Sequence, residues 1–207
     1  MADPTTVVVS AATEGIVDEA VVRRMILEVC AQPGPVYGKN GKRHLRERIT
    51  GYNNAARFSP WIVLIDLDHD AGCAPPLRSH WLPEPVPFMC LRIAVRQVEA
   101  WLLADRENIA KFLAVAASRV PHHVETLTNA KEAMVDLARR SRRRDIREDM
   151  VPGPGSGRPV GPAYASRLIE FAQGMWNPQE AARPSDSLLR SMKCLEASIA
   201  AYRCSAG

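Results

Sequence analysis

Short apolar runs alternate with a longer segment of helical periodicity in the first half of the chain. The runs at 5–11 (TTVVVSA) and 61–66 (WIVLID) are short, apolar and rich in β-branched residues, which predicts two buried strands. A short strand is expected at 36–38, and another apolar segment follows at 88–95. Residues 96–115 carry apolar side chains at helical spacing. Strands that alternate with helices favour an α/β fold with a mostly parallel, buried sheet.

Strand signals stop after about residue 120. A Pro/Gly-rich loop occupies 151–162. Three segments have the periodicity of amphipathic helices: 129–149, 163–176 and 185–202. The chain is therefore expected to fold as an α/β core of residues 1–118, with a helical extension of residues 119–207 packed on it.

Composition and charge are those of an ordinary globular protein. Of the 207 residues, 46% are apolar and 24% are charged, and 27 basic against 23 acidic side chains leave a net charge of +4. This mildly basic balance is compatible with a polyanionic partner. The N-terminal segment does not resemble a signal peptide, and no apolar stretch is long enough to span a bilayer. We therefore expect a soluble, cytoplasmic protein with no membrane partner.

Five cysteines are scattered through the chain, and none forms a C-x-x-C pair. A zinc site and a disulfide framework are therefore not expected. The apolar neighbours of these cysteines favour small, buried side chains in a reducing compartment.

Acidic residues follow two of the predicted strands. Glu14 comes soon after the first strand, and Asp66 and Asp68 lie at the end of the second apolar run. Parallel strands place their carboxyl ends at one edge of a sheet, so these side chains are expected to share a site. Neighbouring carboxylates repel unless a cation lies between them. Oxygen ligands without cysteine favour a hard ion, so Glu14, Asp66 and Asp68 are predicted ligands of Mg²⁺ or Mn²⁺.

Other interpretations of the segment DLDHDAG (66–72) compete with this one. A calcium loop fails, because Ala71 occupies its sixth position and Leu77 the place of its bidentate glutamate. A D-x-D phosphatase of the haloacid-dehalogenase type carries Thr or Val two residues after the second aspartate, where this chain has Asp70. A solvated, Asp-rich turn also fits these residues, since aspartate commonly terminates strands.

The order of the acids resembles the TOPRIM fold of topoisomerases, primases, recombination proteins and OLD-family nucleases. The matching residues are the pair Glu14–Gly15, Asp18, Asp66 and Asp68. Over nearly its full length, the chain is similar to a family of small bacterial TOPRIM-like proteins of unknown function, whose members are suspected to act beside an ATPase in phage defence. The resemblance is carried by the segments EGIVDEAVVRRM, VYGKNGK, VLIDLDHD, IAVRQVEAWLLAD, TNAKEAM, GPAYASRLIEF and SDSLLRSMKCL.

The resemblance implies a Rossmann-like core of four strands with flanking helices. It also implies that Asp66 and Asp68 bind Mg²⁺ and that Glu14 is a metal ligand or a general acid–base. Glu99 would lie near the same strand ends and is a fourth candidate catalytic residue. From its position alone, Asp18 is instead expected to cap the helix that follows the first strand.

Basic residues could offset the charge of a bound phosphate. A Gly-containing segment supplies the candidate substrate-binding residues Lys39, Lys42 and Arg43, although a solvated basic face also explains them. Arg96 is a fourth candidate. Because it precedes Glu99 by three positions, Arg96 is also expected to pair with that carboxylate on one helical face.

These residues lead to the hypothesis of a Mg²⁺-dependent, TOPRIM-type nuclease that hydrolyses phosphodiesters of DNA or RNA. An arginine-rich stretch at 139–144 either follows a nucleic-acid backbone or is ordinary solvated surface. The sequence has no P-loop, so an ATPase partner of the OLD or AAA-like type would be a separate protein in a phage-defence or DNA-processing system. The alternative is a non-catalytic TOPRIM-like sensor or effector subunit of an ATPase complex. A small-molecule phosphatase is a third hypothesis, which depends on the D-x-D motif alone.

Overall fold

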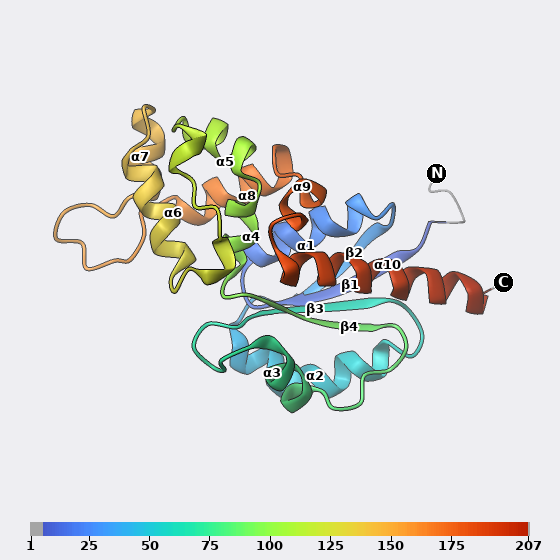
Figure 1. The fold of residues 1–207 in the computed structure, drawn as a ribbon. Helices are drawn as coiled ribbons and strands as arrows, with labels where there is room; N and C mark the ends of the chain where they lie inside the picture. The colour runs from blue at the N-terminus through green and yellow to red at the C-terminus, as the bar shows by residue number, and fades with distance from the viewer. Residues whose placement is uncertain (1–5, 207) are drawn as a thin grey trace.

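A computed structural model describes residues 6–206 and has an α/β fold built on one parallel sheet (Figure 1). The sheet has the order β2-β1-β3-β4, and all of its neighbouring strands run parallel. Its strands are β1 (Val8–Thr13), β2 (Gln32–Gly38), β3 (Trp61–Asp66) and β4 (Met89–Ala94). The predicted α/β class and the four-stranded parallel sheet with flanking helices are confirmed, and the layout is Rossmann-like.

The first two strands differ in extent from the prediction. The run at 5–11 forms β1 from Val8 onward, and Thr5 lies outside the described residues. The short strand expected at 36–38 begins earlier, at Gln32, whose N–H donates to the carbonyl oxygen of Val7 over 2.9 Å. Pairing with β1 therefore extends β2 through a Pro- and Gly-containing stretch that has no strand signal of its own.

Helices cover both faces of the sheet. They are α1 (Ile16–Glu28), α2 (Lys42–Ala55), α3 (Ala74–Trp81), α4 (Val98–Ala104), α5 (Arg106–Leu113), α6 (Ala130–Arg139), α7 (Arg144–Met150), α8 (Tyr164–Gly174), α9 (Pro178–Ala182) and α10 (Asp186–Ala206), with 3₁₀ turns η1 (Ala117–Arg119) and η2 (Val124–Thr126). Across the described part of the chain, no helix combines the length and the hydropathy that crossing a bilayer requires.

Each face of the sheet has its own apolar core. Along β3, Ile62 and Leu64 belong to one core, and Val63 and Ile65 belong to the other. The Val63 side is covered by α2 and α3, which lie below the sheet in Figure 1. The Ile62 side packs against α1 and α4 and continues into the C-terminal helices. Strands buried on both faces explain why their sequences are continuous apolar runs.

The C-terminal helices share a core with the sheet. α8 packs against α1, and α10 lies along β4 (Figure 1). One apolar cluster contains Met25 of α1, Trp101 of α4, Phe171 of α8 and Leu195 of α10. The extension therefore packs on the core, and its helices approach the carboxyl edge of the sheet.

The predicted cap of the first helix is wrong. Gly15 occupies the N-cap of α1, where its backbone is extended. Asp18 lies within the first turn of α1, and its side chain is buried. The helix begins earlier than the prediction because the chain turns directly at the end of β1.

The cysteines are not all core residues, contrary to the prediction. Cys90 is buried, but Cys30, Cys73 and Cys204 are exposed and Cys194 is half-buried. Apolar neighbours in sequence do not decide which side of a helix or loop a residue faces, so this prediction is wrong for most of them.

Candidate functional site

Acidic side chains gather at the carboxyl edge of the sheet. Glu14 follows the last residue of β1, Thr13, and Asp66 ends the neighbouring strand β3. The backbone N–H of Asp66 donates to Oε1 of Glu14 over 2.8 Å. The structure therefore brings these two predicted site residues into contact, because their strands are adjacent and parallel.

Asp18 and Glu99 lie beside Glu14 and Asp66, and we call these four residues the inner cluster. Asp18 comes from the first turn of α1, and Glu99 comes from the first turn of α4. Both residues are buried, with exposed fractions of 7% and 4%. The negative charges of Asp18, Glu99 and Glu14 all act on Asp66, so the four carboxyl groups form one electrostatic unit.

Burial and mutual repulsion raise the pKa values of three acids of the inner cluster, Asp18, Asp66 and Glu14. Burial, together with the charges of Glu14 and Glu99, raises the pKa of Asp18 from 3.8 to about 7. Burial also raises the pKa of Asp66 well above its usual range, and Asp18 and Glu99 act in the same direction. The pKa of Glu14 is raised as well, mainly by burial, although the N–H of Asp66 opposes this. Such a group becomes fully ionised near neutral pH only if a cation offsets its charge.

Hydrogen bonds orient two of the acids. Oδ1 of Asp66 accepts from the backbone N–H of Val98 over 2.9 Å. The Tyr164 hydroxyl donates to Oε1 of Glu99 over 3.3 Å, and the Lys131 ammonium lies 3.7 Å from the same oxygen. Tyr164 and Lys131 come from α8 and α6, so the helical extension completes the wall of the inner cluster.

Within the described part of the chain, one buried carboxylate oxygen of the inner cluster has no hydrogen-bond partner. Oδ1 of Asp18 is buried and forms no hydrogen bond within residues 6–206. A buried carboxylate oxygen is costly unless it is protonated or bound to a cation. An all-oxygen donor set of this kind suits Mg²⁺ or Mn²⁺, so the residues fit a hard divalent ion in their chemistry. As they stand, no three His, Cys, Asp or Glu side chains of the described residues form a ready metal-binding group.

Asp68 and Asp70 form a second group, the outer cluster, around Lys42. The Lys42 ammonium lies 2.7 Å from Oδ2 of each aspartate and 3.9 Å from Oε1 of Glu14. Burial disfavours the ammonium, but the hydrogen bonds to Asp68 and Asp70 outweigh this effect and raise the pKa of Lys42. A lysine therefore supplies positive charge beside Asp68, one of the three predicted metal ligands.

The loop between β2 and α2 places Lys42 beside the acids. The N–H of Lys39 donates to the carbonyl oxygen of Thr13 over 2.7 Å, which ties the loop to the end of β1. Gly38 has a φ of +87°, and a Cβ at this position would lie 2.4 Å from the same oxygen. Only glycine allows this approach. Because the loop is fixed in this way, α2 begins at the site.

Two of the predicted basic residues do not reach the acids. The Lys39 ammonium pairs with Glu19 of α1 at 3.0 Å. Arg43 pairs with Glu47 at 3.5 Å, and its side chain is 93% exposed. Lys42 is the candidate that the loop and the start of α2 deliver to the acidic clusters.

Arg96 contacts the site in a different way from the one expected. Its Nη1 donates to the carbonyl oxygen of Asp68 over 2.9 Å, and the neighbouring Gln97 donates from Nε2 to Oδ1 of Asp68 over 3.3 Å. The predicted pair between Arg96 and Glu99 is wrong. The reason is that α4 begins at Val98, so Arg96 lies before the helix and the spacing rule for helical faces does not apply.

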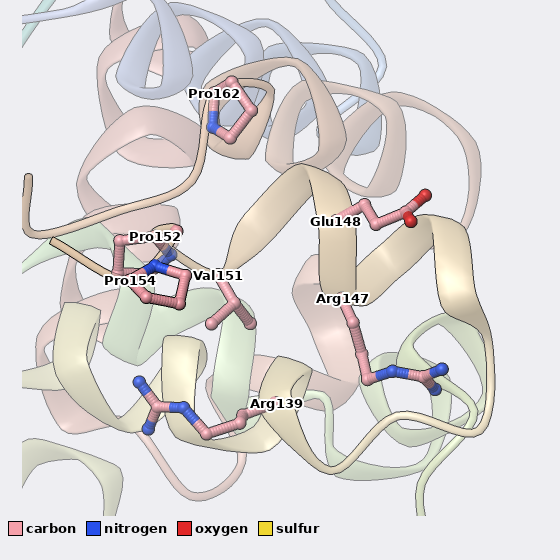
Figure 2. Close-up of a pocket in the computed structure, with 8 residues that line it drawn as sticks. Arg139, Arg147, Glu148, Val151, Pro152, Pro154 and Pro162 are labelled. Carbon is pink, nitrogen blue, oxygen red and sulfur yellow. The ribbon is translucent and has the colours of Figure 1, made fainter. Parts of the chain in front are cut away.

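The arginine-rich stretch is largely neutralised by acidic neighbours. Arg139 pairs with Asp136, and Arg144 pairs with Glu148. A cavity of about 500 Å³ lies between α6, α7 and the Pro/Gly-rich loop, and Figure 2 shows Arg139 and the prolines around it. No residue of the inner or outer cluster lines this cavity. The site at the sheet edge is therefore separate from it.

Several residues of the site are not evident from the sequence. Asp70 stands out there only as a departure from a phosphatase motif, and the roles of Gln97, Lys131 and Tyr164 are not predicted. Each of the last three contacts an acid or its neighbour from a distant segment, so no local motif identifies them. The match to the TOPRIM pattern is what identifies Asp18 as a site residue from the sequence. Its position in the chain alone suggests a helix cap instead.

Comparisons with known proteins assign no family to the chain. No protein-family model matches it, and no match was found among the curated proteins or the solved structures. The site is therefore described by its geometry: a group of four carboxyl groups, two buried and two half-buried, with one lysine and two further aspartates at its rim.

Proposed function

We propose that the chain is a Mg²⁺- or Mn²⁺-dependent nuclease of TOPRIM type that hydrolyses phosphodiesters of DNA or RNA. The observation that carries the proposal is the inner cluster, in which buried and half-buried carboxyl groups converge at the carboxyl edge of the sheet and Oδ1 of Asp18 has no partner within residues 6–206. Proteins rarely retain such repulsion without a role, since it costs stability. A divalent cation is the simplest group that would relieve it.

We assign each residue of the site a separate role. Glu14, Asp66 and Asp68 would hold the ion, which when bound polarises a phosphoryl oxygen and offsets its charge. Glu14 has a raised pKa and would hold or accept a proton at the reacting oxygen. Glu99 would maintain the charge of the cluster, because Tyr164 and Lys131 fix its carboxylate. Lys42 would exchange its contacts with Asp68 and Asp70 for a substrate phosphate.

A nucleic-acid substrate is supported by the charge around the site. The start of α2 carries Lys42, Arg43 and Arg46 close together in sequence, and these line one cavity with Asp70. The net charge of +4 also favours a polyanion. Because the sequence contains no P-loop, any ATP-driven step would depend on a separate ATPase, of the OLD or AAA-like type.

A non-catalytic sensor or effector subunit of an ATPase complex is the second candidate. The observation that favours it is Lys42, which already balances Asp68 and Asp70 at 2.7 Å without an ion. A site that is satisfied in this way could serve as a structural hinge or a weak ion sensor. The two candidates differ in whether purified protein cleaves a phosphodiester.

The test is cleavage of supercoiled plasmid and of labelled single-stranded RNA with Mg²⁺ or Mn²⁺, using the wild type, D66N and D68N. The matched control is D136N, which removes an exposed aspartate of α6 outside the site. We expect D66N and D68N to lose about 100-fold or more of the activity, while D136N keeps it. Equal cleavage by all four proteins would exclude the site. Cleavage that appears only after an ATPase is added would favour the second candidate.

A further inference from the structure

A second cavity, of about 480 Å³, lies along the free edge of the sheet. β4 is an edge strand, and its residues Leu91 and Ile93 line the cavity together with Val95, which follows the strand. α3 supplies one wall, and the first turns of α10 supply the other, on opposite sides of β4 in Figure 1. The volume is within the range of small-molecule sites. The residues of the inner cluster do not line this cavity.

Arginines enter the cavity from all three surrounding elements. Arg78 comes from α3, Arg92 from β4 and Arg190 from α10. Arg190 pairs with Asp186 at 2.7 Å. Within residues 6–206, no carboxylate lies within 4.0 Å of the guanidinium of Arg78 or Arg92. Two arginines thus face one cavity without a carboxylate partner among the described residues.

The other acid of the cavity is already occupied. Oε1 of Glu125 accepts from the hydroxyls of Ser185 and Ser187, at 2.6 Å each, and from the N–H of Ser187 at 2.8 Å. This carboxylate fixes the start of α10 and does not neutralise the arginines. The cavity therefore keeps an excess of positive charge.

Arg92 shows most clearly that a partner is missing. It is half-buried in the middle of β4, and its Nε is buried without a hydrogen-bond acceptor in the described part of the chain. Native structures rarely leave a buried donor of a charged group unpaired. The pKa of Cys194 is lowered to about 6, first by its hydrogen bond with Cys90 and then by the charge of Arg92 and a hydrogen bond with it, so a thiol is the neighbour that Arg92 does have.

We propose that this cavity binds a small phosphate monoester, with its phosphate between Arg78 and Arg92 and its organic part against Leu91, Ile93 and Pro75. Arginine forks bind phosphate oxygens in pairs. Two guanidinium groups match the charge of a phosphate monoester, which is about −1.5 to −2 at neutral pH, better than that of a single carboxylate. The apolar strand side chains would cover a flat or apolar moiety such as a nucleobase. The proposal does not depend on nuclease activity.

The test is isothermal titration of the full chain in EDTA, without nucleic acid, using AMP, inorganic phosphate, adenosine and succinate as probes. We expect saturable binding of AMP, weaker binding of phosphate, and no binding of adenosine or succinate. R78Q and R92Q should each weaken AMP binding about tenfold or more, because each loses charged hydrogen bonds. The matched control R203Q removes an exposed arginine near the C-terminal end of α10 and should bind as the wild type does.

Four results would overturn the proposal: no binding of AMP or phosphate at millimolar concentration, unchanged binding in R78Q and R92Q, succinate binding equal to that of phosphate, or an equal loss of binding in R203Q. R92Q changes a half-buried residue, so its fold is checked by circular dichroism. Arg78 is exposed, and R78Q therefore keeps the test valid even if R92Q fails to fold. D68N should bind AMP as the wild type does, which separates this cavity from the acidic site.

Discussion

The ammonium of Lys42 lies 2.7 Å from Oδ2 of Asp68, and it bridges to Asp70 at the same distance. This contact explains how a buried strand can end in a row of aspartates. The lysine is at the first position of α2, and a glycine-containing loop anchored on β1 delivers it there. A divalent ion that binds Asp68 would have to compete with this ammonium. The charge balance of Asp68 and its binding of an ion are therefore coupled.

Replacement of Lys42 by methionine tests that competition. In EDTA, K42M should lower the free energy of unfolding by about 1 kcal/mol, because Asp68 and Asp70 lose a partly exposed partner. Added Mn²⁺ should stabilise K42M at lower concentrations than the wild type, since no lysine competes for the carboxylates. Urea denaturation with and without MnCl₂ measures both effects.

The matched control for this experiment is K193M, which removes an exposed lysine of α10. It should change neither the stability in EDTA nor the response to Mn²⁺. If Mn²⁺ stabilised K42M and the wild type over the same concentration range, Lys42 and the ion would not share ligands.

Asp18 should make stability depend on pH. Its pKa is raised from 3.8 to about 7 in the folded state, so between these values the folded chain binds a proton that the unfolded chain has released. Stability should therefore fall as pH rises from about 4 to about 7, with a slope of at most about 1.4 kcal/mol per pH unit from this group. D18N removes the titration and should flatten the curve, as measured by urea unfolding in EDTA between pH 5 and 8.

The comparison of D18N with the wild type isolates this effect. Groups distant from Asp18 contribute equally to both curves and cancel, whereas Asp66 and Glu14 interact with Asp18, so their part of the difference belongs to the same acidic unit. D18N should be more stable than the wild type above pH 7, because one buried charge is gone. Parallel curves for the two proteins would show that Asp18 is not protonated in the folded state.

The strand ends that carry the acids can be predicted from the sequence, but the side chains that contact those acids cannot. The prediction that Glu14 and Asp66 lie together is confirmed, because both follow apolar runs whose carboxyl ends must meet in a parallel sheet. The contact of Tyr164 with Glu99 spans 65 residues and depends on how α8 packs on α1. Helical spacing assigns Arg96 to Glu99, and a small error in the helix start removes that pair. Local patterns fix strand ends, whereas long-range packing decides which side chains meet.

The hydroxyl of Tyr164 should contribute to stability through Glu99. Y164F removes a buried hydrogen bond of 3.3 Å and leaves the Glu99 carboxylate with Lys131, so the free energy of unfolding should fall by about 1 kcal/mol. Y37F is the matched control, since Tyr37 is exposed on β2, and it should be nearly neutral. Equal stability of Y164F and the wild type in urea would show that this contact does not hold α8 against α4.

Two glycines, one at the end of β2 and one in the second half of α2, should respond in opposite directions to alanine. Gly38 has a positive φ, and its Cβ would lie 2.4 Å from the carbonyl oxygen of Thr13 and 2.7 Å from Cδ2 of Leu45. G38A should therefore cost about 2–4 kcal/mol, because the loop must move away from β1. Gly51 is helical, and a Cβ there would meet nothing beyond its own helix within 4 Å. G51A should therefore stabilise the protein by about 0.5–1 kcal/mol.

G38A and G51A should also differ in how strongly Mn²⁺ stabilises them. The displaced loop in G38A carries Lys42 away from Asp68 and Asp70, so G38A should also show the stronger Mn²⁺ response expected of K42M. G51A changes a position far along the helix from Lys42 and should respond to Mn²⁺ as the wild type does. If G38A were as stable as the wild type, the close approach of the loop to Thr13 would be wrong. If it were destabilised without any change in its response to Mn²⁺, the loop would not be what positions Lys42.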